Sequence, residues 1–239
     1  MKRRMLITTV VVLAVLIAGV LVGRSALVSF FYPRPGKLPP VVFETTEKLL
    51  MRFQFVLEKR APEVLRSLQS GLSDEQISEL EKKGGFTLSS DLRDLYRWRN
   101  GSKDYQKNLI PGQRFLPLEE VVAKRAALKD DIKTASLIQR VFYYVFAGYR
   151  KTWVHILDDG AGDGYFYDPG RSGTSGGFFY HLAEGGYYVF FPSLRNFLKG
   201  AIDCYEQEIF IVKDEGSNLD EDYDRAMKVW NNLGYSNMQ

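Results

Sequence analysis

The sequence predicts an α+β domain in which N-terminal helices pack on a mainly antiparallel β-sheet, a further helix closes the domain, and one transmembrane helix precedes it. Three observations support this. Apolar residues recur at helical spacing between residues 45 and 99. Residues 141–191 carry short β-branched and aromatic runs separated by Gly and Asp, as in strands joined by turns. Helical spacing then returns after Ser193.

An uncharged apolar stretch, Met5–Gly23, follows three basic residues at the start of the chain. As a helix it would span about 28 Å, close to the hydrocarbon core of a bilayer. A cleaved signal peptide is the alternative, but its apolar region would be unusually long and its end matches the small-x-small cleavage rule poorly. We therefore expect an uncleaved anchor over residues 1–24. Its lipid-facing candidates are Met5, Leu6, Leu13, Leu16, Leu21 and Gly23.

The charges that flank this stretch predict its orientation. Lys2, Arg3 and Arg4 favour a cytoplasmic N-terminus and a domain outside the cytoplasm, although three basic residues on the other flank weaken the bias. We expect a single-pass membrane protein. Residues 25–43 hold four prolines and should form an extended spacer.

The predicted domain covers residues 44–211 and begins with four helices. Their N-caps are expected at Thr45 or Thr46, just before Pro62, at Ser73 and at Ser89 or Ser90. Ser73 and Gln76 have the spacing of a capping box. In the fourth helix the apolar residues are Leu92, Leu95 and Tyr96, and we expect Asn100-Gly101 to end it in the left-handed conformation.

The second half of the domain should contain the sheet. A helix is predicted over residues 119–128, followed by a polar loop at 129–132 and a closing helix after Ser193. The acidic tail, residues 212–239, has the pattern of one short amphipathic helix. Strands are predicted over residues 141–147, 152–157, 165–167, 178–182 and 186–191.

Charge and composition exclude several classes of protein. The net charge is +3, and without the three basic residues at the N-terminal tip 29 basic residues balance 29 acidic ones. A neutral domain argues against a nucleic-acid partner, because such binding depends on neutralising phosphates. The single cysteine, Cys204, forms no intramolecular disulfide, and two histidines cannot supply a His-rich metal site.

No catalytic residue, metal site or cofactor is predicted. Four aspartates surround the hairpin at 158–164, but an EF-hand alignment fails because Ala161 and Gly170 occupy ligand positions. Turn formation explains these aspartates without a metal. The Gly173–Gly177 match to G-x-S-x-G lacks the strand before and the helix after that a nucleophile elbow needs. A hydrolase acting through Asp158, Asp163 and Asp168 remains an alternative.

An ordered set of short motifs resembles the SUKH superfamily, in its fungal cell-wall-assembly-regulator-like branch. The motifs are Gly71-Leu-Ser73, Leu88-Ser-Ser-Asp-Leu92, Leu95-Tyr96, Asn100-Gly101, Ile110-Pro-Gly112, Phe115-Leu-Pro-Leu118, the hairpin at 158–164 and Ser193 with Phe197. The resemblance covers roughly Thr45 to Tyr205, and Ser89 stands where the family usually has proline. It implies an α+β domain without catalysis, used by bacteria in immunity proteins that neutralise toxins and by fungi in cell-wall scaffolds.

We therefore predict a non-enzymatic, membrane-anchored protein-binding module, such as an immunity protein that neutralises a toxin. A cell-envelope scaffold or regulator is the alternative. The expected partners are a toxin or cell-envelope protein and, through the anchor, the lipid bilayer. In the competing interpretation Trp98 belongs to the core and the aspartates form turns. The candidate contact residues are Trp98, Arg99, Asn100, Asp158, Asp159, Asp163, Tyr165 and Asp168.

Overall fold

A computed structural model describes residues 42, 44–103, 107–137, 139, 152–168, 177–182, 186–191, 193–212 and 219–233. The predicted anchor, almost all of the spacer, the strand predicted at 141–147 and the G-x-S-x-G match lie outside these residues. None of the helices in the described part has the length and apolar character needed to span a membrane. The membrane anchor and its orientation therefore stay predictions.

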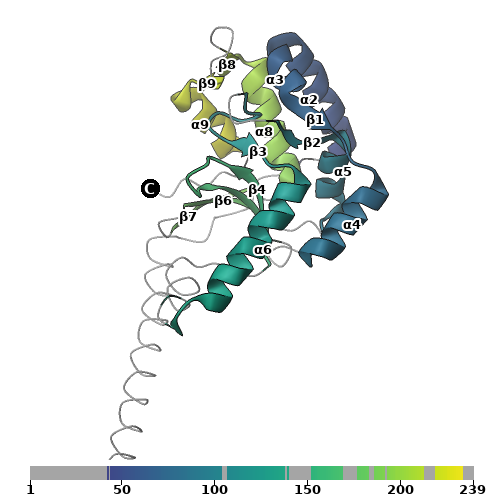
Figure 1. Cartoon of the computed structure of the whole chain (residues 1–239). Helices are drawn as coiled ribbons and strands as arrows, with labels where there is room; N and C mark the ends of the chain where they lie inside the picture. Colours follow the sequence, from purple (N-terminus) through teal and green to yellow (C-terminus); the bar gives the residue numbers. More distant parts are fainter. Residues whose placement is uncertain are drawn as a thin grey trace, which may run out of the picture. The chain divides into compact units, whose positions relative to one another are not determined.

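The described residues form an α+β fold with antiparallel sheets, which confirms the predicted class (Figure 1). The helices are α2 (Thr46–Arg60), α3 (Pro62–Ser67), α4 (Asp74–Gly84), α5 (Ser90–Trp98), α6 (Leu118–Thr134), α8 (Leu194–Glu206) and α9 (Tyr223–Asn232). The main sheet has the order β3 (Arg114–Phe115), β4 (Val154–Asp158), β5 (Gly164–Asp168), β6 (Gly177–Leu182) and β7 (Gly186–Phe191). Two small sheets pair β1 (Leu68–Ser70) with β2 (Arg99–Ser102) and β8 (Phe210–Val212) with β9 (Leu219–Glu221).

The main core lies between α8 and one face of this sheet. Alternate residues of a strand point to opposite faces, so Phe178 of β6 faces α8, whereas its neighbour Phe179 does not. The ring of Phe197 lies 4.7 Å from that of Phe178 and 5.3 Å from that of Phe191. Phe179 instead packs against Trp153, with ring centroids 4.7 Å apart.

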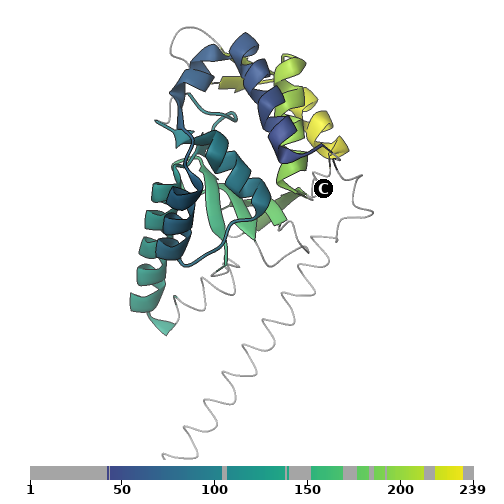
Figure 2. The same cartoon turned by 90° about the vertical axis from the view of Figure 1, so that its right-hand side faces the viewer.

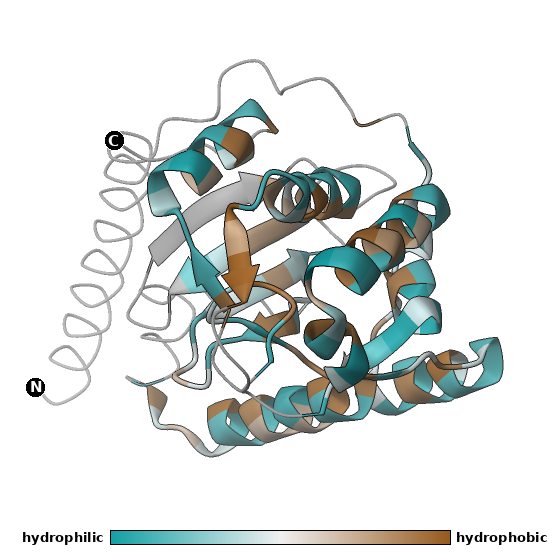
Figure 3. Cartoon of the chain, turned by 90° about the horizontal axis from the view of Figure 1, so that it is seen from above, coloured by the Kyte–Doolittle hydropathy of each residue, from teal (hydrophilic) through white to brown (hydrophobic). Residues whose placement is uncertain are grey.

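The helices surround this core with amphipathic faces. α2, α8 and α9 lie side by side (Figure 2), and α6 runs along the sheet beside β4 (Figure 1). Hydrophobic and hydrophilic residues alternate along the helices (Figure 3), which is the pattern of elements buried on one side only.

The predicted helix starts are confirmed by their caps. The side chains of Thr45, Ser73 and Ser89 accept hydrogen bonds from the backbone N–H groups of Lys48, Gln76 and Leu92, respectively. Ser73 and Gln76 complete a capping box. Ser193 caps the closing helix through the N–H of Asn196. Each cap satisfies a donor that the helix itself leaves unpaired.

The predicted polar loop at residues 129–132 is wrong, because α6 continues to Thr134. The polar residues in this part of α6 do not end the helix, because two of them bind to α4. Arg125 and Lys129 donate hydrogen bonds of 3.3 Å and 3.2 Å to the carbonyl oxygen of Gly84, at the end of α4. Ile132 is buried and continues the apolar face.

The prediction that Asn100-Gly101 closes α5 in a left-handed conformation is also wrong. The helix ends at Trp98, and Arg99 adopts extended backbone angles, φ −149° and ψ 140°, that lead into β2. Gly101 does have a positive φ of 76°, but within β2. A Cβ atom at Gly101 would lie 2.3 Å from the backbone nitrogen of Pro117. The glycine therefore permits a close approach of two chain segments instead of closing the helix.

The predicted C-terminal helix is present as α9, and it packs on the same core. The Trp230 ring stacks on Phe197 with centroids 5.8 Å apart and meets the edge of Phe191 at 5.4 Å. Trp230 also fills the space beside Gly200, where an added Cβ atom would lie 2.2 Å from the indole ring. α9 thus contributes to the structure that holds α8, and α8 in turn contacts α2.

Candidate protein-binding groove

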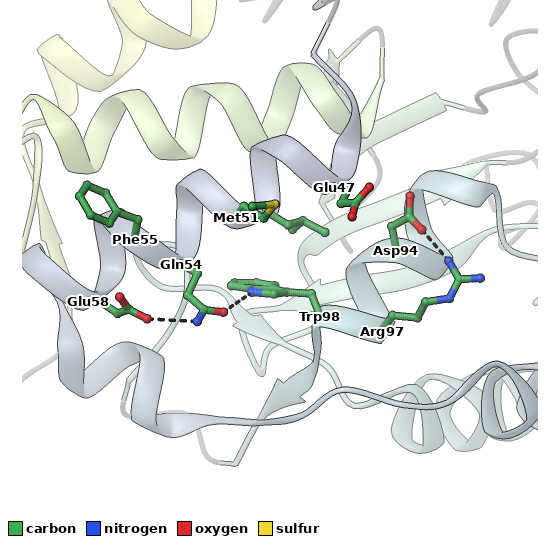
Figure 4. Close-up of a pocket in the computed structure, with 9 residues that line it drawn as sticks. Glu47, Met51, Gln54, Phe55, Glu58, Asp94, Arg97 and Trp98 are labelled. Carbon is green, nitrogen blue, oxygen red and sulfur yellow. Dashed lines mark hydrogen bonds and ion pairs between the residues drawn. The ribbon is translucent and has the colours of Figure 1, made fainter.

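A groove of about 680 Å³ runs between α2 and α5 (Figure 4). Its walls come from helices that are adjacent in space but separated in the sequence by α3, β1 and α4. The groove is lined by Glu47, Leu50, Met51, Gln54, Phe55, Glu58, Asp94, Arg97 and Trp98.

Two large apolar side chains of α2 are exposed in this groove. Met51 has 67% and Phe55 56% of its surface accessible, and they lie about one helical turn apart. The core-facing stripe of α2 is made by Leu49, Phe53 and Val56, so Met51 and Phe55 project from another side of the helix. Exposed apolar groups that lie together with polar residues around them are typical of interaction sites.

Trp98 lines the same groove and is held firmly. Its ring stacks on Phe53 with centroids 5.7 Å apart, and its indole N–H donates a 3.1 Å hydrogen bond to Oε1 of Gln54. Nε2 of Gln54 in turn donates to Glu58 at 3.0 Å. Arg99 donates to the same Gln54 oxygen at 3.3 Å and lies over the Trp98 ring. A half-buried indole fixed in this way offers contact area with little loss of side-chain entropy.

One end of the groove is acidic. Glu47 and Asp94 face each other there, and Arg97 donates to Asp94 at 2.6 Å (Figure 4). Burial raises the pKa of Asp94, Arg97 opposes this change, and Asp91 and Glu47 add to it. Like charges at this end are therefore only partly compensated.

Among the predicted contact residues, Asn100 is buried and serves the fold. Its Nδ2 donates a 2.9 Å hydrogen bond to Glu119, and its Oδ1 accepts a 2.9 Å bond from the N–H of Leu118. The side chain thus caps the start of α6. Only 5% of Asn100 is accessible, so the surface that it could offer a partner is small.

Asp158, Tyr165 and Asp168 are buried as well. Asp158 forms a 2.8 Å ion pair with Lys124, and Asp168 accepts a 3.1 Å hydrogen bond from the indole of Trp153. Tyr165 lies in the core with its ring stacked on Phe178. These three side chains hold the hairpin to the domain, so the predicted contact surface at the hairpin loses most of its members.

Asp159 and Asp163 lie at the hairpin tip and are partly accessible. Oδ1 of Asp159 accepts hydrogen bonds of 2.8 Å, 3.0 Å and 3.0 Å from the N–H groups of Ala161, Gly162 and Asp163. This is the turn-forming role predicted for the aspartates. Of the eight predicted contact residues, only Trp98 lines the groove.

Comparison with known families identifies the domain. Residues 71–200 match the model of the SMI1 / KNR4 family (SUKH-1). The chain belongs to this family. The predicted SUKH superfamily is thereby confirmed, and the fungal branch stays a prediction. No curated protein matches the sequence. The matched segment of this SUKH-1 chain contains α5 but not α2, so the groove joins a helix inside that segment to one outside it.

The SUKH-1 fold separates the three aspartates of the hydrolase alternative. Asp158 pairs with Gly164, beside Asp163, at one end of the β4–β5 ladder. Asp168 ends β5, four residues beyond Gly164, which corresponds to about 14 Å along a strand. Within the described residues, no group of three acidic, histidine or cysteine side chains is placed to hold a metal ion. This geometry gives the hydrolase alternative no support.

Sequence reasoning missed Met51, Gln54 and Phe55 as site residues. It assigned the apolar stripe of the helix to the core and did not consider apolar residues outside that stripe. The signal was nevertheless present in the sequence, because Met51 and Phe55 share a helix face with Glu47 and Glu58 rather than with Phe53. A large apolar pair on a charged face indicates a surface that another molecule covers.

Proposed function

We propose that this SUKH-1 protein is a non-enzymatic binding module that captures a protein partner in the α2–α5 groove. The observation that carries the proposal is the exposure of Met51 and Phe55 beside the fixed ring of Trp98. Interfaces draw most of their affinity from a few apolar and aromatic anchors in a well-packed centre. The polar residues around these anchors, such as Gln54 and Glu58, suit the rim of such an interface.

The role favoured for this module is that of an immunity protein that neutralises a toxin. Family membership supports a protein partner, because SUKH domains generally serve as immunity or regulatory modules. The pairing of the buried hairpin residues Asp158 and Asp168 with Lys124 and Trp153 supports a structural role for them. In this role the groove would block the toxin by occupying a surface that the toxin needs.

The proposal includes anchoring to a membrane through residues 5–23, with the domain outside the cytoplasm. The uncharged apolar length and the preceding basic residues support the anchor and its orientation. Protease treatment of intact cells tests the orientation. Cleavage of the domain without cell lysis is expected, and protection of the domain until lysis would contradict it.

A cell-envelope scaffold is the second candidate. The observation that favours it is the Pro-rich segment at residues 25–43, whose composition suits a spacer between membrane and domain. The two candidates differ in the partner, since an immunity protein needs a toxin and a scaffold needs a resident envelope protein.

Co-expression with each toxin encoded beside this gene tests the immunity role. The full chain should restore growth and should bind the toxin. The double variant Met51→Ser/Phe55→Ser should lower the affinity by about 30-fold or more, corresponding to about 2 kcal/mol, and abolish the rescue. Its stability should change little, because both side chains are exposed.

Leu137→Ser is the matched control, since Leu137 is 72% exposed and does not line the groove. It should rescue growth as well as the wild type. Full rescue by the groove variant would refute the groove as the docking site. Failure of the wild type to bind any of these toxins would refute the immunity role.

A further inference from the structure

The groove between α2 and α5 has two chemically different ends. Glu47 and Phe55 are eight residues apart on α2, so about 12 Å of helix axis separates them. The Glu47 end carries the carboxylates of Glu47 and Asp94. The Phe55 end carries an exposed aromatic ring with Nζ of Lys59 lying 4.1 Å from its centroid, and its one carboxylate, Glu58, accepts a 3.0 Å hydrogen bond from Gln54. A partner that fits this groove must match both ends in one orientation.

The acidic end has more negative charge than its own cations compensate. Arg97 is the one basic residue that lines the groove within the described residues, and it is already bound to Asp94 at 2.6 Å and Asp74 at 2.5 Å. Asp91 is held by Thr46 at 2.7 Å and by Arg195 at 3.4 Å. Glu47 makes no ion pair with any described residue and is exposed.

Two further cations near the groove, Lys59 and Arg99, are engaged elsewhere. Lys59 is engaged with the Phe55 ring, and Arg99 is engaged with Gln54 and Trp98. Neither contacts Glu47 or Asp94. A cation supplied from outside would therefore meet an uncompensated carboxylate at Glu47 and a partly desolvated one at Asp94, which strengthens the attraction.

The apolar part of the groove specifies the shape of the partner. Met51 and Phe55 stand one turn apart with Trp98 between the two helices, which is the arrangement that receives apolar side chains spaced one turn apart on a helix (Figure 4). An extended strand would lack its usual support, because the groove is walled by two helices and offers no free strand edge.

We infer that the groove binds an amphipathic helix of the partner protein, with two apolar side chains over Met51, Trp98 and Phe55 and a Lys or Arg one turn further on against Glu47 and Asp94. The inference rests on the proposed binding function and deepens it. It defines the partner segment by its chemistry: an apolar stripe flanked by basic residues at one end.

A pair of synthetic helical peptides tests the inference. The first has leucines along one face and lysines at one end of that face, and the second is identical except that every lysine is glutamate. The full chain is held in nanodiscs of zwitterionic phosphatidylcholine, which has no net charge, so that the lysine peptide finds no anionic lipid. Fluorescence anisotropy of the labelled peptide measures the affinity at low and at high salt.

The lysine peptide should bind saturably, and the glutamate peptide should bind at least tenfold more weakly. Glu47→Lys should weaken binding of the lysine peptide about tenfold at low salt and less at high salt, because screening removes the charge contribution. Met51→Ser/Phe55→Ser should abolish binding of both peptides. Glu79→Lys makes the same charge change at an exposed site of α4 outside the groove and should leave binding unchanged.

Equal weakening by Glu47→Lys and Glu79→Lys would overturn the inference, since binding would then report only overall charge. Tighter binding of the glutamate peptide would overturn it too. Concentration-dependent dimers that Phe55→Ser abolishes would assign the groove to a second copy of the chain instead. If neither peptide binds while toxin rescue still depends on Met51 and Phe55, the helical partner is refuted and the proposed function stands.

Discussion

His155, which is largely but not completely buried, makes the stability of this fold depend on pH. Its ring stacks on Phe166 with centroids 4.1 Å apart, and its Nε2 atom lies 3.9 Å from Asp158. Burial is the main cause that lowers the pKa of His155 to about 4, from an ordinary 6.5. The folded protein therefore keeps this imidazole neutral at pH values where the unfolded chain protonates it.

The low pKa of His155 predicts a loss of stability in acid. Above pH 6.5 the imidazole is neutral in both states, and between pH 6.5 and about 4 only the unfolded state gains the proton, so the stability falls as the pH falls. The contribution over this window is about 3 kcal/mol. Urea unfolding of the full chain at pH 7.5 and 4.5 should show a smaller pH-dependent loss in His155→Phe. Equal losses in the variant and the wild type would contradict the assignment.

Residue identity alone did not reveal which polar side chains are available for binding. Asn100 and Asp158 are polar residues in segments that favour turns, so exposure was expected. Both are nevertheless buried, where Asn100 accepts a hydrogen bond from Leu118 and Asp158 pairs with Lys124. These partners are 18 and 34 residues away in the sequence. Such long-range pairing depends on the fold and leaves no local pattern, whereas the turn role of Asp159 is local and was predicted.

At the scale of elements, helix starts were predictable and element ends were less so. A cap such as Ser89 satisfies donors within a few residues, so its effect can be read locally. The extension of α6 through Lys129 depends on the Gly84 carbonyl, 45 residues away. The strand after Trp98 forms because residues 99–102 pair with residues 68–70. No local sequence pattern predicted that pairing.

Glu81 links α4 to α5 and so helps to place one wall of the groove. Its carboxylate accepts a 2.7 Å hydrogen bond from the N–H of Leu88 and forms a 2.5 Å ion pair with Arg93. Only 7% of Glu81 is accessible. Removing the carboxylate would leave a buried N–H and a partly buried guanidinium without this partner.

Glu81→Ala should therefore lower the free energy of unfolding by about 3 kcal/mol, measured by urea unfolding. Glu81→Gln should lose less, because its amide oxygen can still accept from Leu88. Glu79→Ala is the control on the same helix, where the exposed side chain should contribute less than 0.5 kcal/mol, on the order expected for surface sites. A loss in Glu81→Ala no larger than in Glu79→Ala would show that this link does not hold α5.

At the scale of the whole molecule, the groove depends on an assembly wider than its two walls. α5 lies within the family segment, whereas α2 precedes it and packs on α8, which closes the sheet and carries α9. The general class of this assembly followed from the order of helical and strand patterns. The groove did not, because it arises only when α2 and α5 meet and leave Met51 and Phe55 uncovered.

Substitution of Trp230 tests whether α9 contributes to the stability of this assembly. Its ring contacts Phe197 and Phe191 and is 5% accessible, so Trp230→Ala should create a cavity beside α8. Loss of a buried tryptophan costs about 3–5 kcal/mol, and for a domain of this size each kcal/mol lowers Tm by roughly 2–4 °C. Calorimetry should therefore show Tm lowered by about 10 °C.

Tyr223→Ala, at the 63% exposed start of the same helix, should leave Tm nearly unchanged. Equal Tm values for Trp230→Ala and Tyr223→Ala would mean that α9 is an appendage, and that the core supporting the groove is complete without it.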